Sequence, residues 1–260
     1  MITSAAFTEV PLTGKTLTPE QLAFFNDNGY VLLRGFFSEQ EMQAMKELRD
    51  RATARAGEAG GSFHDGPAHY DVEPLASDPT GKTMGLRKIQ EAYQVEPAFR
   101  EVMAQDKLLD IVEDLIGPNI YYHSSKLMCK PGNGGRRKPW HQDFAYWSGM
   151  QPNQVTVWTA VDKATTENGC MQLIPGSHKR GLIEHHQIED LQIQEDSLAD
   201  EDILVAEMDP GDTLIFSVLT LHASDPNLSP HSRLSCIIDF DSAPAPEGSQ
   251  MGSSVPIRSQ

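Results

Sequence analysis

The sequence predicts an α+β domain whose larger part is a barrel or sandwich of short β-strands. Helical signals lie within about residues 18–117, whereas about residues 119–240 alternate short apolar segments with turn residues. Helices followed by strands, rather than alternating with them, favour an α+β domain, and several short strands favour a sandwich or barrel. We expect residues 1–260 to form one domain, with a loosely ordered tail at 241–260 that is rich in Pro, Ser and Gly.

The first two helices carry capping boxes in the sequence. Thr18 is followed by Pro and, three residues after the cap, by Gln21; Ser38 is followed in the same way by Glu41. In such a box the two side chains cap each other's free backbone N–H groups at the helix start. An apolar period over residues 108–115 predicts a further helix, which a Gly-Pro pair ends.

Two polar segments are expected to be loops. Residues 57–85 are rich in Gly, Pro, Asp and Ser, which predicts a long surface loop in which His64 and His69 are loop residues rather than ligands. Residues 184–202 are dense in His, Gln, Asp and Glu, which favours a solvated insertion.

Seven segments bounded by Gly, Pro, Asn or Asp are predicted to be strands. They are 119–129, 141–146, 154–161, 170–174, 203–208, 213–219 and 233–240.

Composition excludes several classes of protein. With 21 basic and 37 acidic residues the formal charge is -16, which argues against a nucleic-acid or anionic-membrane partner. Three scattered cysteines are too few for a disulfide framework. The first residues lack a signal-peptide pattern, and no apolar run is long enough to span a membrane. We therefore expect a cytoplasmic protein, either a monomer or a homodimer, with reduced thiols.

The stretch Pro139-Trp140-His141-Gln142-Asp143 carries the first chemical signal. In an extended strand, side chains two positions apart share one face, so His141 and Asp143 could grip one metal ion. His222, at the far end of the strand that begins near residue 213, is the most plausible third ligand. Two histidines and one carboxylate are typical of non-haem Fe(II) oxygenases.

Arg233 supplies the second signal. We expect its strand to pair antiparallel with the strand that leads to His222, which would bring the guanidinium close to the metal. Arginine can clamp a carboxylate through two parallel hydrogen bonds, while the other end of a dicarboxylic co-substrate chelates the metal. A 2-oxo acid with a distal carboxylate is 2-oxoglutarate. His222 follows His141 by 81 residues (222 − 141), and Arg233 follows His222 by 11 (233 − 222). The four residues together form a far more specific pattern than His-x-Asp alone.

With these motifs the chain resembles the phytanoyl-CoA dioxygenase family of Fe(II)/2-oxoglutarate-dependent oxygenases. The matching text is TPEQLAFFNDNGYVLLRGFF at 18–37, Arg87-Lys88-Ile89, PWHQD at 139–143, residues 157–160, ATTENG at 164–169, IPGSH at 174–178, and His222 followed by Ser224, Pro226, Asn227 and Arg233.

The resemblance implies a double-stranded β-helix core, a jelly roll of the cupin type. It places His141, Asp143 and His222 on iron and Arg233 on the tail of 2-oxoglutarate. It also places the residues Lys88, Trp158 and Ser224 along the co-substrate pocket, and it puts Lys126 where relatives often carry methionine.

The implied reaction is hydroxylation, or another oxidation, of an unactivated C–H bond in a small molecule, with 2-oxoglutarate decarboxylated to succinate. Fe(II), 2-oxoglutarate and O₂ are the implied cofactors and co-substrates, and ascorbate is expected to support turnover. The carboxylate of Asp143 argues against halogenation, because halogenases of this family leave that coordination position open for chloride.

Several of these residues have a second interpretation. A cupin-like metal protein acting as an isomerase, lyase or sensor needs the three metal ligands but has no use for Arg233. Trp158 could equally be a core residue, and Lys88 an ordinary surface lysine. The run Arg136-Arg137-Lys138 could receive an anionic substrate group or be a solvated basic loop, and Trp140 could be a core residue or a substrate contact.

Overall fold

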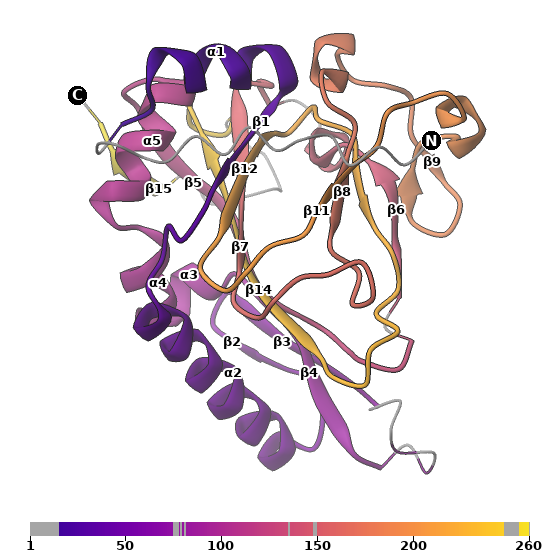
Figure 1. Ribbon diagram of the computed structural model, residues 1–260. Coiled ribbons are helices and arrows are strands. Elements are labelled where there is room, and N and C mark those ends of the chain that lie inside the picture. The colour runs from indigo at the N-terminus through magenta and orange to yellow at the C-terminus, as the bar shows by residue number, and fades with distance from the viewer. Residues whose placement is uncertain are drawn as a thin grey trace.

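Two facing β-sheets and a layer of helices make up the structure (Figure 1). The computed structural model describes residues 16–74, 78, 80, 82–134, 136–147, 150–246 and 255–259. Within these ranges a nine-stranded sheet has the order β1-β12-β7-β14-β5-β4-β3-β2, with β15 also paired to β5, and a four-stranded sheet has the order β11-β8-β13-β6. The small sheet faces one side of the large sheet, and the helices cover the other (Figure 1). This arrangement is the predicted jelly-roll core.

The strands of the large sheet are β1 (Tyr30–Leu33), β2 (Phe63–Asp65), β3 (Ala68–Pro74), β4 (Met84–Gln90), β5 (Ile120–Lys130), β7 (Gln154–Ala160), β12 (Thr213–Ser217), β14 (Arg233–Asp241) and β15 (Val255–Arg258). The small sheet holds β6 (Lys138–His141), β8 (Met171–Leu173), β11 (Leu204–Ala206) and β13 (His222–Ser224). The helices are α1 (Pro19–Asn28), α2 (Glu39–Ala59), α3 (Ala92–Val95), α4 (Pro97–Met103) and α5 (Asp106–Ile116).

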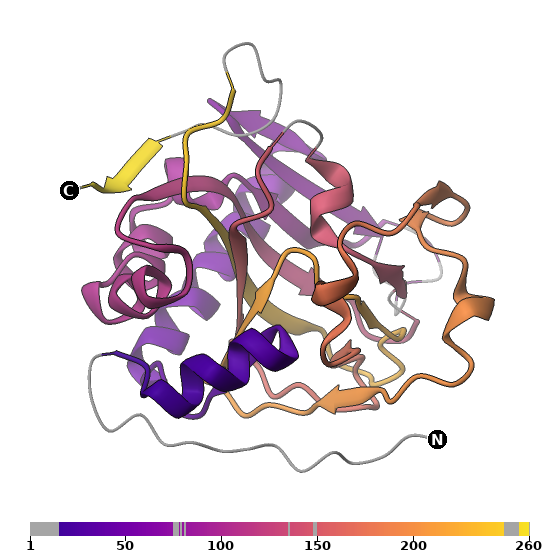
Figure 2. The same ribbon diagram turned by 90° about the horizontal axis from the view of Figure 1, so that it is seen from above.

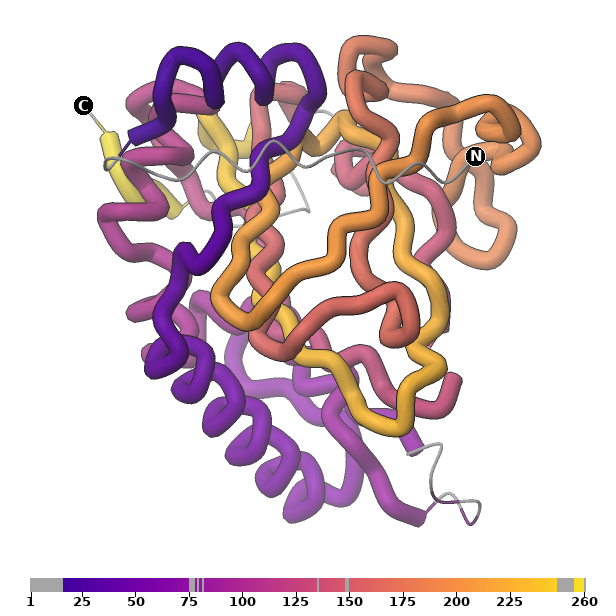
Figure 3. Tube along the Cα trace, in the orientation of Figure 1, coloured from indigo at the N-terminus to yellow at the C-terminus, as the bar shows by residue number. Residues whose placement is uncertain are grey.

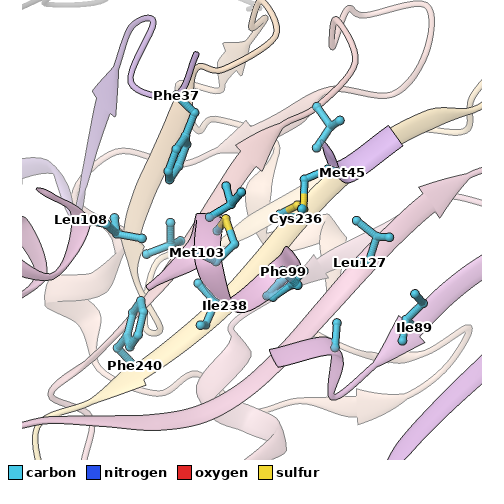
Figure 4. Packing of buried hydrophobic residues seen from close by; sticks show 14 of the residues in the cluster. Phe37, Met45, Ile89, Phe99, Met103, Leu108, Leu127, Cys236, Ile238 and Phe240 are labelled. Atoms are coloured by element: carbon cyan, nitrogen blue, oxygen red, sulfur yellow. The ribbon is translucent and has the colours of Figure 1, made fainter. Parts of the chain in front are cut away.

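Alternation along the central strands creates two separate apolar layers. On β14, Cys236, Ile238 and Phe240 point toward the helices and pack with residues such as Phe99 and Leu108, as Figure 4 shows. The residues of β14 at the alternate positions point into the barrel. There, Trp158 of β7 and Leu214 and Phe216 of β12 pack against strands of the small sheet. Polar side chains on this inner face are therefore directed toward a confined interior, and they are the ones available to form a site.

Both predicted capping boxes are present. In α1 the backbone N–H of Gln21 donates to the Thr18 hydroxyl at 3.2 Å, and the Gln21 side chain accepts from the Thr18 N–H at 2.8 Å. Ser38 and Glu41 form the same pair of bonds at the start of α2. The predicted helix over residues 108–115 is α5.

The prediction of one long loop over residues 57–85 is wrong. The described part of this range contains the end of α2, the hairpin of β2 and β3, and the first residues of β4. Residues 75–77, 79 and 81 lie outside the described residues. Ala68, Tyr70 and Val72 alternate as buried residues with polar ones between them, and the glycines and acidic residues around them conceal this short period in the sequence. The rings of His64 and His69 stack across the hairpin at a centroid distance of 4.5 Å, so they are strand residues.

Two other local predictions are wrong around the ligands. The predicted strand 141–146 is replaced by the end of β6 at His141 and a 3₁₀ helix, η1 (Asp143–Tyr146), because the Phe144 N–H turns to donate to the carbonyl of Val218. The strand of Arg233 does not pair with that of His222. Instead, β14 lies between β5 and β7, while the chain crosses from β12 to β13 in the opposite sheet through a turn closed by the Thr220 N–H and the Ser217 carbonyl.

The tail is ordered where the structure describes it beyond residue 246. There β15 pairs with β5, and Arg258 forms ion pairs with Asp110 at 2.8 Å and Glu113 at 3.0 Å on α5. The expectation of a loose tail is therefore wrong for residues 255–258, and residues 247–254 lie outside the described residues.

The insertion predicted over residues 184–202 projects on the side of the molecule away from the helices, as the views in Figures 2 and 3 show. It contains β9 (His186–Gln187), β10 (Leu191–Gln192) and the 3₁₀ helix η3 (Glu195–Leu198). In the part of the chain that is described, no helix is both long and apolar enough to cross a membrane.

Candidate functional site

Three side chains converge inside the barrel at the edge of the small sheet. His141, the last residue of β6, is the cross-strand partner of His222, the first residue of β13. Asp143, two residues after His141, begins η1. Oδ1 of Asp143 lies 3.5 Å from Nε2 of His141 and 3.6 Å from Nε2 of His222, close enough for one ion to contact all three. The structure thus brings together the three residues that the sequence singled out.

The backbone selects which nitrogen of each imidazole faces the centre. Nδ1–H of His141 donates to the carbonyl of Pro139 at 2.8 Å, and Nδ1–H of His222 donates to the carbonyl of Thr220 at 3.0 Å. This tautomer leaves the Nε2 lone pairs directed at Asp143, as a metal site requires. Burial lowers the pKa of His222 to about 4. Burial opposes ionisation of Asp143, but the adjacent His222 and His141 hold its pKa below the usual range. Two imidazole nitrogens beside an ionised carboxylate form a donor set that suits a divalent cation.

The second oxygen of Asp143 is held by Thr156 on β7. The Thr156 hydroxyl lies 2.8 Å from Oδ2 of Asp143 and also 2.8 Å from Oδ1 of Asp239 on β14. Since a hydroxyl has one proton, Thr156 can donate to only one of these carboxylates. Burial raises the pKa of Asp239, which makes Asp239 the better candidate for the protonated partner. Sequence reasoning missed both residues; the available signal was that Thr156 shares a strand face with Trp158.

Gln142, the central residue of the His-Gln-Asp motif, fixes the position of the ligand segment. Its buried side chain donates to the carbonyls of Gly181 at 2.8 Å and Leu219 at 2.7 Å, and it accepts from the Ile183 N–H at 2.8 Å. Its backbone N–H donates to Nε2 of His185 at 2.9 Å. Gln142 therefore ties the segment between the two ligands to the turns on either side of it.

Arg233 lies on the inner face of β14. Its guanidinium stands over the Trp158 ring at 5.1 Å from the centroid, and it donates through Nη1 to the carbonyl of Gly169. The residue is only 3% exposed, and its buried Nε has no hydrogen-bond partner among the described residues. A buried guanidinium with an unused donor is suited to an anionic ligand, so these residues fit the carboxylate of a co-substrate.

Ser224 is two residues beyond His222 on β13 and contacts a lysine that sequence reasoning missed. Nζ of Lys130, the last residue of β5, donates to the Ser224 hydroxyl at 2.8 Å and to the carbonyl of Asp225. Burial, with repulsion from Arg233, lowers the pKa of Lys130 to about 7. The sequence signal for Lys130 was its position four residues after Lys126, on the same face of an alternating strand.

Lys88 and Lys126 lie on the neighbouring strands β4 and β5 of the large sheet. Lys88 on β4 is opposite Met128, and Lys126 on β5 is opposite Ile237, which is in turn opposite Trp158. Lys88 is partly buried, and this burial lowers its pKa. The five residues expected around the co-substrate thus come from four strands of the large sheet and one of the small sheet.

A family model described as phytanoyl-CoA dioxygenase matches residues 25–235 of the chain. The chain belongs to the phytanoyl-CoA dioxygenase family. Among its relatives, the ectoine dioxygenase of Sphingopyxis alaskensis is 27% identical over 246 residues, which cover 86% of this chain and 76% of the relative. A methylphosphonate hydroxylase of Gimesia maris is 30% identical over 229 residues, covering 87% and 81%. The human peroxisomal phytanoyl-CoA dioxygenase is 26% identical over 261 residues, covering 93% and 75%.

Solved structures agree on the fold of this family member. The crystal structure of EctD from S. alaskensis with 2-oxoglutarate and 5-hydroxyectoine has a TM-score of 0.73 at 22% identity, covering 99% of this chain and 92% of that one. The 2-oxoglutarate-dependent carbocyclase SnoK has a TM-score of 0.70 at 20% identity, covering 96% and 97%. The predicted jelly-roll fold is confirmed, and so is the predicted reaction class: an iron- and 2-oxoglutarate-dependent dioxygenase that uses O₂.

The basic run of this dioxygenase is engaged by its own insertion. Arg137 forms ion pairs with Glu189 at 2.6 Å and Glu195 at 3.2 Å, and Lys138 pairs with Asp190 at 2.5 Å. Of the three basic side chains, two therefore already have carboxylate partners. These ion pairs argue against the interpretation that the run Arg136-Arg137-Lys138 receives an anionic substrate group.

Trp140 is a core residue. It packs with Ile174, Ile193, Leu198 and Leu221 in an apolar cluster between the small sheet and the insertion. Its position between the ligand strand and the insertion supports the backbone of His141, which settles the choice left open by the sequence in favour of packing.

Proposed function

We propose that His141, Asp143 and His222 bind a catalytic Fe(II), and that Arg233 and Ser224 bind the distal carboxylate of 2-oxoglutarate. The observation that carries the proposal is the convergence of three ligand atoms, in the same barrel as a buried guanidinium whose Nε has no partner in the part of the chain that the structure describes. The enzyme then hydroxylates, or otherwise oxidises, a C–H bond of a small molecule. The substrate names of the relatives differ widely, so family membership alone leaves the substrate class broad.

Each residue has a definable task in this proposal. The two imidazoles and Oδ1 of Asp143 would hold the Fe(II) as its three protein ligands. Bound iron and 2-oxoglutarate supply the oxidising chemistry, in which 2-oxoglutarate is decarboxylated to succinate and one oxygen atom goes to the substrate. Trp158 provides an apolar wall beneath Arg233, and Lys88 and Lys126 provide positive charge along the co-substrate path. The presence of a carboxylate at 143 favours oxygen over halide transfer.

The cellular setting is part of the proposal. The three cysteines are free and buried, which is compatible with a reducing compartment such as the cytoplasm. Ascorbate belongs in the assay because we expect it to sustain turnover.

The test is substrate-dependent formation of succinate from 2-oxoglutarate by the purified protein with Fe(II), ascorbate and O₂. Screening covers neutral, cationic and anionic metabolites. His141→Ala should abolish both turnover and Mn(II) binding measured by calorimetry, whereas His64→Ala, a surface histidine remote in sequence from the ligands, should change neither. Unchanged metal binding by His141→Ala would refute the assignment.

A cupin-like isomerase, lyase or sensor is the competing function. Such a protein would bind the metal without 2-oxoglutarate. Titration of 2-oxoglutarate into the Mn(II) form separates the two possibilities, since only the dioxygenase should bind it and should lose it with Arg233→Ala.

A further inference from the structure

Two buried cations face each other across the end of the large sheet. Lys130 and Arg233 are direct cross-strand partners of β5 and β14, and they are 7% and 3% exposed. Like charges opposite each other in an antiparallel pair are destabilising, and a buried cation needs a counter-charge. Throughout the described part of the chain, neither residue forms an ion pair with a carboxylate. The pair is therefore arranged for an anion that the chain itself does not provide.

The contacts of Lys130 determine what Ser224 can do. Because the Lys130 ammonium donates to the Ser224 oxygen at 2.8 Å, the serine must direct its own proton elsewhere. The Ser224 hydroxyl has no second hydrogen-bond partner within the described residues. Its proton is free to be donated to an acceptor beside Arg233.

Gly169 leaves the space that Lys130 and Arg233 need at this end of the large sheet. Its carbonyl accepts from Arg233. A Cβ at this position would lie 2.9 Å from Nζ of Lys130 and 2.2 Å from the carbonyl of Asp225, and its φ of 73° is one that glycine adopts readily. Any larger residue would push Lys130 off Ser224, so the glycine turn keeps Arg233, Lys130 and Ser224 together.

We propose that Lys130 is a positioning residue of the distal-carboxylate site: it orients the Ser224 hydroxyl toward the co-substrate and adds a second positive charge beside Arg233. The site then selects 2-oxo acids that carry a distal carboxylate over those that do not. This inference rests on the proposed function, because it assigns Lys130 to the 2-oxoglutarate site of that enzyme.

The experiment compares two ligands by calorimetry on the Mn(II)-loaded protein, namely 2-oxoglutarate and 2-oxopentanoate, which has a methyl group in place of the distal carboxylate. In Lys130→Met, the affinity for 2-oxoglutarate should fall by about 10- to 100-fold, the range of a lost charge-assisted hydrogen bond. The affinity for 2-oxopentanoate should change by less than about twofold, because that ligand has nothing for Lys130 to act on. Lys163→Met, which removes an exposed lysine paired with Asp209, is the matched control and should affect neither ligand.

The outcomes are distinct. Equal losses for both ligands, or no loss for either, would overturn the role of Lys130. Failure of the wild-type protein to bind either ligand would overturn the proposed function instead. If Lys130→Met does not fold, as judged by circular dichroism, Lys130→Gln keeps hydrogen-bond donors without the charge. It should still lose selectivity for 2-oxoglutarate, and wild-type selectivity in that variant would equally refute the inference.

Discussion

Thr156 holds one oxygen of Asp143 at 2.8 Å, and the other oxygen is left facing the two imidazoles. Groups that orient a metal ligand commonly contribute about 10- to 100-fold to metal affinity. Because Thr156 binds one carboxylate oxygen and leaves the other free for a metal, its contribution to metal affinity can be tested.

Thr156→Val should weaken Mn(II) binding by about 10- to 100-fold, because valine keeps the shape of threonine but cannot donate to Asp143. Calorimetric titration of the metal measures the effect. Thr159→Val is the matched control: on the same strand it loses a hydrogen bond to Thr213 at 3.0 Å and should leave metal affinity unchanged. Similar metal affinities for the two variants would contradict the role of Thr156.

Arg233→Met should raise the Kd of 2-oxoglutarate by about 100-fold, since two charge-assisted hydrogen bonds to a carboxylate are lost. Arg233→Lys should recover only part of it, because an ammonium cannot reproduce the planar fork. Arg180→Met, which breaks an exposed ion pair with Glu201, serves as the control. Tight 2-oxoglutarate binding in Arg233→Met would show that the distal carboxylate lies elsewhere.

Trp140→Ala should destabilise the fold by about 3–5 kcal/mol, the usual cost of removing a large buried aromatic side chain. Urea unfolding at equilibrium measures this change. Trp140→Phe should retain most of the stability and leave the substrate KM unaltered, as expected of a packing residue. A raised KM with normal stability in the phenylalanine variant would restore the substrate-contact interpretation.

The affinity for 2-oxoglutarate should fall as the pH rises above about 7. Burial, together with the nearby Arg233 and Arg87, lowers the pKa of Lys130 to about 7, and Asp225 and Cys170 oppose part of this shift. Below this pH the lysine is charged and favours the carboxylate; above it, binding must be accompanied by proton uptake, which costs affinity. Calorimetry at about pH 6.5 and about pH 8.5, each in two buffers, measures the affinity and the proton uptake on binding. Lys130→Met should show neither the decline nor the proton uptake, and a persistent decline would assign the titration to another group.

Local signals in the sequence sufficed for the parts of the molecule that depend on neighbouring residues. The capping boxes at Thr18 and Ser38 satisfy backbone groups within one helical turn, so their sequence pattern is complete in itself. The two-residue spacing of His141 and Asp143, joined to His222 and Arg233, was equally sufficient to indicate the chemistry, because a metal and a carboxylate accept few donor sets.

Tertiary structure decided which distant residues meet. β13 has three residues, too few for an apolar period, and the crossover to the second sheet that places it beside β6 is a property of the whole barrel. The same holds for Lys130 opposite Arg233 and for Thr156 beside Asp143. Each residue is unremarkable in its own strand, and its role arises only from cross-strand register, which is determined by burial across the whole sheet rather than by local sequence.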